Sequence, residues 1–439
     1  MEQYNSYKPS GVEWIGDIPE NWDLIKLKYI SNLYNGSSLN DNQKELFDSS
    51  NIDDIPYVST KDIDYNSQSI EYDNGLRIPK SNTSFKLGKK GSFLICIEGG
   101  SSGKKMGYLE QDVYFVNKLC CFEPKTNSKF QYYYIQTPLF QLQFHSSLSG
   151  LIGGVSISLI RNFNTILPPI QEQEQIVNYL DEKTTIIDKL ISTKQRKVEL
   201  LKEQRTTLIN QVITKGLNPN VKMKDSGVEW IGEIPEIWNN TTLRYYVNKV
   251  GSGITPRGGS EVYVDEGVIF IRSQNVHFNG LRLDDVSRIT NETHIGMSGS
   301  KVIFNDLLLN ITGGSIGRCC VVLNEDEMNV NQHVCIIRTK KEKLSPFFLN
   351  YILQSKVGQT QVDYFQTGGN REGLTGENIK NFKISFPNIQ EQQEIVDYLD
   401  THTKEIDDLV SMEQKKIELL KEYRQSLISE VITGKIKVV

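Results

Sequence analysis

Residues 168–214 read PPIQEQEQIVNYLDEKTTIIDKLISTKQRKVELLKEQRTTLINQVIT, and residues 387–433 repeat them as PNIQEQQEIVDYLDTHTKEIDDLVSMEQKKIELLKEYRQSLISEVIT. The two copies are identical at 28 of 47 aligned positions. In both, apolar residues recur at alternating steps of three and four, which predicts a long helix with a coiled-coil seam. The seam includes Leu180, Ile187, Lys194, Leu201 and Leu208 in the first copy and Leu399, Ile406, Glu413, Leu420 and Leu427 in the second.

The simplest partner for each predicted helix is the other copy. Prolines at 168, 169 and 387 mark the helix starts, and glycines at 216 and 434 mark the ends. Because a separate domain adjoins each helix, the pair can run antiparallel, which brings the polar seam residues Lys194 and Glu413 close to each other. Their opposite charges would then help to fix the register; alternatively, the two side chains extend separately to solvent.

A second repeat reads SGVEWIGDIPENW at residues 10–22 and SGVEWIGEIPEIW at residues 226–238, and we call these two segments the tags. We expect each tag to be the place where the chain passes from the helical frame into a domain. The tryptophans should pack that junction, because bulky aromatic residues beside a proline turn usually belong to the core; stacking on a DNA base is the alternative. They are Trp14, Trp22, Trp230 and Trp238.

The two repeats divide the chain into six segments. The first tag lies in residues 1–22, a first variable domain in 23–167, and a central helical spacer in 168–217. The second tag lies in residues 218–238, a second variable domain in 239–386, and a C-terminal helical spacer in 387–439.

The variable domains are predicted to share one fold. The first has strand-like runs IDDIPYVSTKDID, GSFLICIEG and DVYFVNKLCCFEP, and then a helix-like FQYYYIQTPLFQLQF. The second has EGVIFIRSQNV, DLLLNITGG and MNVNQHVCIIRT, and then a helix-like SPFFLNYILQSKV. The predicted fold class is therefore mixed α/β (α+β), with two similar domains separated by two long helices that form an antiparallel coiled coil with pseudo-twofold symmetry.

Composition is that of an ordinary globular protein, with 38% hydrophobic and 23% charged residues among 439. No apolar run approaches the roughly 20 residues of a membrane span, and the N-terminus lacks the features of a secretory signal, so a cytoplasmic location is expected. The six cysteines form no C-x-x-C and the five histidines lie far apart, which favours buried free thiols over a zinc site.

Motifs of catalysis are missing. GGSSGKK at residues 99–105 is one residue too short for a phosphate-binding P-loop and has Lys105 in place of the Ser or Thr. The sequence contains no dinucleotide fingerprint, no zinc-protease motif, no nucleophile elbow and no Asn/Asp-Pro-Pro-aromatic tetrad of adenine-N6 methyltransferases. We therefore expect a non-catalytic chain that binds no metal or cofactor.

DNA recognition fits the remaining features better. A DNA-reading protein needs backbone that approaches phosphates closely, basic side chains, and amide or guanidinium groups for base edges. Net charge is −5, but the two variable domains are close to neutral and carry local basic clusters. Ordinary turns and solvated loops are the alternative for each residue taken alone, whereas their occurrence at matched positions favours the set.

Candidate DNA contacts come from both domains. In the first domain they are Ser59, Thr60, Lys61, Lys86, Lys89, Lys90, Gly99, Gly100, Ser101, Ser102, Lys104 and Lys105. In the second domain they are Arg272, Ser273, Gln274, Asn275, Gly313, Gly314, Ser315, Arg318, Asn370 and Arg371.

The order of tag, variable domain, P-x-I-x-E-Q-x-x-I-V-x-Y-L-D and E-L-L-K-E-x-R-x-x-L-I-x-x-V-I-T, all occurring twice, resembles the specificity subunit of type I restriction–modification systems. The resemblance covers essentially the whole chain. It implies that each variable domain is a target recognition domain and that the helices dock two methyltransferase subunits. Those partners would bind S-adenosylmethionine and methylate adenine N6, and restriction subunits with ATP and Mg would complete the complex.

Two unlike domains on a pseudo-twofold frame should read an asymmetric target, with two half-sites around an unread gap. Because major-groove faces repeat about every 10 base pairs, the helices would act as the ruler for that gap. The alternatives are a protein–protein adaptor that uses the coiled coil without reading DNA, and an enzyme with activity of its own.

Overall fold

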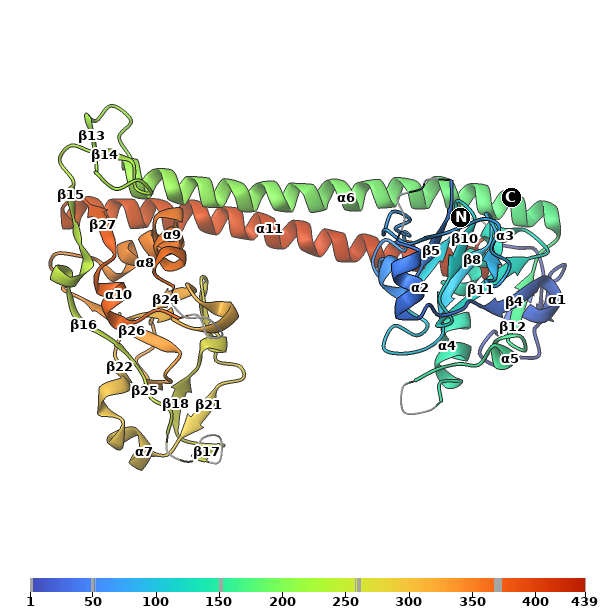
Figure 1. Cartoon of the computed structure of the whole chain (residues 1–439), viewed down its shortest axis with the longest axis horizontal. Coiled ribbons are helices and arrows are strands. Elements are labelled where there is room, and N and C mark those ends of the chain that lie inside the picture. Colours follow the sequence, from blue (N-terminus) through green and yellow to red (C-terminus); the bar gives the residue numbers. More distant parts are fainter. Residues whose placement is uncertain are drawn as a thin grey trace. The chain divides into compact units, whose positions relative to one another are not determined.

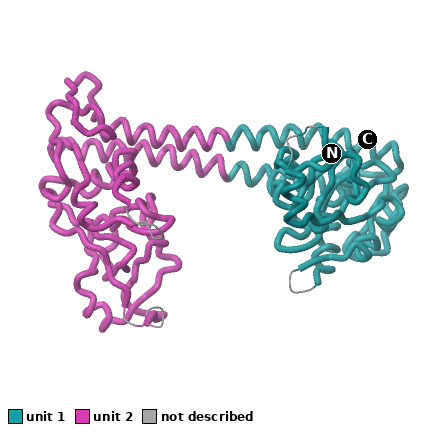
Figure 2. The backbone as a smooth tube through the Cα atoms, viewed as in Figure 1, with its two compact units in different colours: residues 1–195, 415–439 teal, residues 196–414 magenta. Residues whose placement is uncertain are grey.

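The computed structural model describes residues 3–48, 51, 53–149, 153–256, 258, 262–366 and 373–438. Contacts divide the chain into two compact units, one of residues 1–195 with 415–439 and the other of residues 196–414 (Figure 2). Each unit therefore contains one variable domain together with a segment of both long helices. In the described part of the chain, no helix is long and apolar enough to cross a membrane.

The two predicted long helices are confirmed as α6 (Ile170–Lys215, 46 residues) and α11 (Ile389–Ile432, 44 residues) (Figure 1). In the first unit, Ile187 of α6 shares a hydrophobic cluster with Leu427 of α11. In the second unit, Val212 of α6 shares a cluster with Val396 of α11. The early part of one helix thus meets the late part of the other, so the two run antiparallel as predicted.

Ion pairs between α6 and α11 occur at equivalent positions in the two units. In the first unit Arg424 Nε donates to Asp188 at 2.9 Å, and in the second Arg205 Nε lies 3.0 Å from Asp407. Both residues of the first pair map onto the second pair by a shift of 219 positions, the offset between the helical repeats (387 minus 168). Each helix copy therefore contributes the arginine to one unit and the aspartate to the other.

The predicted seam faces the partner helix. Its buried members are Leu180, Ile187, Leu201, Leu399, Ile406, Glu413 and Leu427, and Lys194, Leu208 and Leu420 are half-buried. Glu413 is only 3% exposed and accepts a hydrogen bond from Lys197 Nζ at 3.1 Å. The pairing of Glu413 with Lys194 stays a prediction.

The first variable domain contains two four-stranded sheets. One has the order β4 (Ser31–Asn35), β11 (Leu119–Pro124), β8 (Phe93–Cys96), β9 (Met106–Tyr108). The other has the order β6 (Arg77–Ile78), β5 (Ile55–Val58), β10 (Val113–Phe115), β7 (Leu87–Gly88). A separate pair of strands, β3 (Asp23–Lys26) and β12 (Asn164–Leu167), joins the ends of the domain. The helices are α1 (Leu27–Ile30), α2 (Asp41–Leu46), α3 (Ser128–Ile135), α4 (Pro138–Ser146) and α5 (Ile157–Ile160).

The second variable domain repeats this topology. One sheet has the order β16 (Val247–Ser252), β26 (Val334–Thr339), β23 (Leu307–Asn310), β24 (Cys319–Val321). The other has the order β17 (Tyr263–Val264), β21 (Ser287–Ile289), β18 (Val268–Ile271), β25 (Met328–Val330), β22 (Lys301–Val302). The pair that joins the ends of this domain is β15 (Asn239–Thr242) with β27 (Lys383–Phe386). A hairpin of β19 (Val276–His277) and β20 (Gly280–Leu281) follows β18. The helices are α7 (Asn291–Gly296), α8 (Pro346–Gln354), α9 (Lys356–Phe365) and α10 (Gly376–Lys380).

The shared mixed fold is thereby confirmed, including a parallel pairing in each domain, β5 with β10 and β18 with β25. Both runs predicted as single helices are broken in two. α4 starts at Pro138, which lacks the N–H that would continue α3, and Thr137 caps the new helix. α8 ends at Gln354, and the extended backbone of Ser355 separates it from α9.

All six cysteines are buried and free, as the sequence indicated. Burial raises the pKa of the Cys320 and Cys335 thiols to about 12, so both stay protonated at neutral pH and pack as small apolar groups.

Each tag supplies the second strand of a short antiparallel ribbon whose first strand precedes the tag: β1 (Tyr7–Pro9) pairs with β2 (Asp17–Pro19), and β13 (Met223–Asp225) pairs with β14 (Glu233–Pro235). The predicted packing of the tryptophans holds for Trp22 and Trp238, which are fully buried, and in part for Trp230, whose ring centroid lies 5.4 Å from that of Tyr364. It is wrong for Trp14, which is 49% exposed. Trp14 lies in the turn of its ribbon, where the chain turns Ile15 inward instead.

Candidate nucleic-acid interface

Two of the predicted loops meet in the first variable domain. The strand-end loop, residues 59–62, follows β5, and Ser59 Oγ donates to Asp62 Oδ2 at 2.6 Å, which closes the turn. The glycine-rich loop, residues 98–105, follows β8. Lys105 Nζ donates to the carbonyl of Thr60 at 2.9 Å and so ties the two loops together.

The corresponding loops meet in the second variable domain by other chemistry. The strand-end loop, residues 272–275, follows β18, and the glycine-rich loop, residues 312–318, follows β23. Asn310, the last residue of β23, donates from Nδ2 to the carbonyl of Ser273 at 2.8 Å and to Ser315 Oγ at 3.1 Å. The same two loops are therefore joined in both domains.

A third loop borders each glycine-rich loop. In the first domain Glu98 forms a bridge with Gly154, and Gly99 N donates to the carbonyl of Gly153 at 3.0 Å. In the second domain Thr312 forms the equivalent bridge with Gly373. The predicted contacts Asn370 and Arg371 precede Gly373 in sequence and lie outside the described residues.

The glycine-rich loops leave their backbone open. Gly99 and Gly313 have φ of +88° and +71°, a conformation that glycine adopts most readily. A Cβ placed on Gly99, Gly100, Gly313 or Gly314 would meet no heavy atom within 4 Å. A phosphate can therefore approach the main chain at these positions without displacing a side chain.

The basic candidates of the first domain separate into two groups. Lys61 and Lys104 are exposed beside the joined loops, whereas Lys105 is half-buried and held by Thr60. Lys86, Lys89 and Lys90 flank the edge strand β7 instead, and Lys89 Nζ pairs with Glu123 at 2.8 Å. A hydrogen bond from Lys89 holds the pKa of the Glu123 carboxyl below its usual range.

Two candidates are corrected by their burial. Ser102 is 5% exposed, and Asn275 is 3% exposed. Asn275 accepts from the backbone N–H of Arg272 at 3.0 Å and donates to the carbonyl of Arg282 at 2.9 Å. Neither side chain is accessible to a base or a phosphate, and that of Asn275 holds the backbone of its own loop instead.

The remaining candidates of the second domain stay accessible. Gln274 is exposed, and Ser273, Ser315 and Arg318 are half-buried along the joined loops. The guanidinium of Arg272 lies over the ring of Tyr263, 5.7 Å from its centroid.

Sequence reasoning missed Asn310 and Tyr263. Asn310 ends an apolar run, where a lone buried amide is a signal for a structural hydrogen bond. His333 was also missed by sequence reasoning. Its Nδ1 lies 2.6 Å from Oγ1 of Thr312 in the glycine-rich loop, so the exposed neighbour Gln332 lies next to that loop.

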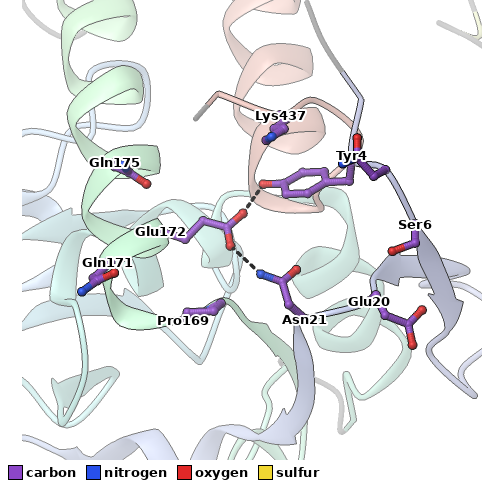
Figure 3. A pocket seen from close by; sticks show the side chains of 10 residues that line it. Tyr4, Ser6, Glu20, Asn21, Pro169, Gln171, Glu172, Gln175 and Lys437 are labelled. Atoms are coloured by element: carbon purple, nitrogen blue, oxygen red, sulfur yellow. Dashed lines mark hydrogen bonds between the residues drawn. The ribbon is translucent and has the colours of Figure 1, made fainter.

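A pocket of about 570 Å³ marks the junction of tag and helix in the first unit (Figure 3). At its centre Glu172, in the first turn of α6, accepts hydrogen bonds from Tyr4 Oη and from Asn21 Nδ2, the latter at 3.1 Å. Burial, followed by the contact with Glu172, raises the pKa of the Tyr4 phenol, so it remains a donor. The pocket lies against a structural joint that holds the tag to the helix.

The corresponding joint of the second unit uses the tryptophan itself. Trp238 Nε1 donates to Glu391 Oε1 at 3.1 Å, and Glu391 is the counterpart of Glu172. In the first unit Trp22 Nε1 is buried and has no hydrogen-bond partner among the described residues. The two joints therefore satisfy the same carboxylate with different donors.

Comparison with known proteins gives a consistent result. A family model described as the type I restriction modification DNA specificity domain matches residues 19–200 and 235–420. The type I restriction enzyme EcoBI specificity subunit of Escherichia coli is 23% identical over 437 residues, which cover 95% of this chain and 87% of that protein. The type I restriction enzyme MjaVIII specificity subunit of Methanocaldococcus jannaschii is 27% identical over 290 residues, 65% of this chain.

The chain spans 60% and 64% of the lengths of the two Methanocaldococcus jannaschii relatives that it matches. A solved chain from work on complex assembly and conformational transition of a type I R-M system has the same fold, with a TM-score of 0.72. The match covers 95% of this chain and 99% of that one at 16% identity.

Proposed function

The chain belongs to the family of type I restriction–modification DNA specificity proteins, and we propose that it reads an asymmetric, split DNA target with one half-site for each variable domain. The observation that supports this most directly is the matched junction of loops. Both domains join a strand-end loop to an open glycine-rich loop, but Lys105 holds the junction in one and Asn310 in the other. The shared frame suits two equivalent positions on DNA, and the different side chains suit two different half-sites.

The long helices set the gap between the half-sites in this proposal. Both are continuous over more than forty residues, and a helix rises by about 1.5 Å per residue. Insertion of four residues after Thr214, next to the end of α6, is expected to change the gap and to leave both half-sites unaltered. Sequencing of methylated sites would measure both; altered half-sites with an unaltered gap would contradict the ruler role.

Two methyltransferase subunits are the proposed partners of the helices. Leucines outside the seam, Leu190 and Leu200 on α6, are exposed, and so are their counterparts Leu409 and Leu419 on α11. Exposed leucines at equivalent positions of the two helices offer the same apolar contacts twice, which two copies of one partner could use. Leu200→Glu together with Leu419→Glu should therefore stop co-purification of the methyltransferase without unfolding the chain.

The chemistry is assigned to the partners. The methyltransferase subunits would bind S-adenosylmethionine and methylate adenine N6 in cytoplasmic DNA, and restriction subunits would add ATP- and Mg-dependent translocation and cleavage. This chain would select the site for all of them.

Co-expression tests the proposal. A host without its own adenine methylation would carry the methyltransferase genes with or without this chain, and its genome would be sequenced for N6-methyladenine. We expect one split motif that depends on the chain. Methylation that is independent of the chain, or a chain that shows no salt-sensitive binding to DNA, would favour the adaptor without DNA readout.

A further inference from the structure

Arg272 occupies an unusual environment for an arginine. It directly follows β18, its guanidinium lies over the ring of Tyr263, and its Nε is buried. Within the described ranges, which have gaps at 257 and 259–261, this Nε has no hydrogen-bond partner. A half-buried guanidinium normally pairs with a carboxylate or a carbonyl, because its donors lose water on burial.

Stacking restricts the side chain without using its donors. An aromatic face attracts the guanidinium and limits its rotation, while the N–H groups in the plane of the fork remain available. The arrangement thus resembles a binding group that is held in place before its ligand arrives.

The position of Arg272 in the domain indicates which kind of ligand its guanidinium would bind. The next residue, Ser273, is tied through its carbonyl to Asn310 at the start of the glycine-rich loop. Gly313 and Gly314 of that loop present open backbone for a phosphate. Arg272 adjoins this junction of loops in sequence, and its fork can bind the edge of a base there; a phosphate contact is the alternative that the test must separate.

We propose that Arg272 reads a guanine in the half-site of the second variable domain, by donating two hydrogen bonds to O6 and N7. Guanine alone presents two adjacent acceptors in the major groove, which match the arginine fork. The inference rests on the proposed function, because it requires this domain to lie on DNA.

The first domain cannot make the same contact. The matched residue is Ser59, whose hydroxyl is already held by Asp62. The guanine should therefore be specified in one half-site only.

The test is methylation sequencing of the whole complex with Arg272→Ala and Arg272→Lys, beside the natural chain. With Arg272→Ala, one guanine position of one half-site should accept other bases, with discrimination falling about 5- to 150-fold, while the other half-site and the gap stay unchanged. Arg272→Lys should keep most of the affinity but restore the guanine preference only in part. Tyr263→Leu should relax the same position more weakly.

Arg244→Ala serves as the matched control, since that arginine pairs with Glu377 on α10 outside the three loops. It should leave the motif unaltered. Because Arg272→Lys keeps the charge and the stem, it stays informative if Arg272→Ala fails to fold.

Three outcomes separate the possibilities. Uniformly weaker methylation of an unaltered motif, with full rescue by lysine, would identify a phosphate contact and overturn the inference. A split motif without a guanine at any position affected by Arg272 would also overturn it and would leave the proposed function intact. If the complex with the natural chain methylated no motif that depends on this chain, the proposed function itself would be refuted.

Discussion

The two units of the molecule have one frame and two sets of side chains. The first joins its strand-end and glycine-rich loops through Lys105 and holds its tag to the helix through Tyr4 and Asn21. The second joins the same loops with Asn310 and holds its tag through Trp238. The backbone topology is thus insensitive to which donor closes each joint, and this leaves the surface of each unit free to differ.

Substitution of the buried tryptophans should give the largest effect, and it tests whether the two tag junctions contribute equally to the free energy of unfolding. Trp22→Ala and Trp238→Ala should each lower the free energy of unfolding by about 3–5 kcal/mol, because each removes a fully buried ring. Trp14→Ala is the control and should change it by less than about 0.5 kcal/mol. Chemical denaturation of the three variants would measure this, and a large loss with Trp14→Ala would disprove the assignment of Trp14 to the surface.

Glu413 tests the polar position of the seam. Glu413→Lys should cost about 3 kcal/mol, because it places a second positive charge beside Lys197 in a buried position. Lys194→Glu changes the counterpart in a more exposed position and should cost less. Thermal melting that is unchanged by Glu413→Lys would mean that both side chains can extend to solvent separately.

The loop junctions come next. Asn310→Ala removes two hydrogen bonds from a fully buried amide and should destabilise the second unit by about 1–3 kcal/mol. Lys105→Ala removes one hydrogen bond from a half-buried chain and should cost less than about 1 kcal/mol. Each variant should relax only the half-site of its own domain, as read by methylation sequencing, and relaxation of both half-sites by either variant would contradict independent domains.

The smallest effect distinguishes the two tag joints. Trp238→Phe removes the hydrogen bond to Glu391, whereas Trp22→Phe removes a buried N–H that has no partner among the described residues. The first should therefore be more costly than the second by about 1 kcal/mol. Equal losses would show that the bond to Glu391 contributes nothing to the joint.

The repeated features could be predicted because their signal is periodic or duplicated. The seam extends over many turns, so both long helices follow from the spacing of apolar residues, and their antiparallel pairing follows from the separate domain that adjoins each helix. Single interruptions were harder to weigh: Pro138 and Ser355 each divide a run that otherwise has helical character. In the first tag, Trp14 has the bulky aromatic side chain that is typical of a core residue, but the turn directs this side chain to solvent.

The candidate site was predictable as a region and less so residue by residue. Strand ends and glycine loops identify where the backbone is open. They do not reveal that Asn275 is buried beneath its loop or that Asn310 joins two loops far apart in sequence. Such roles depend on contacts across the domain, which a single sequence does not encode locally.

The composition of the units also orders events during synthesis. The core of the first unit combines Leu180 with Val431 and Ile432, which the ribosome adds much later than Leu180. All residues of the second unit, 196–414, have by then been made. The unit that contains residues 1–195 must consequently wait for residues 415–439 to complete its core, and a chain truncated before residue 415 should expose residues 1–195 to proteases rather than residues 196–414.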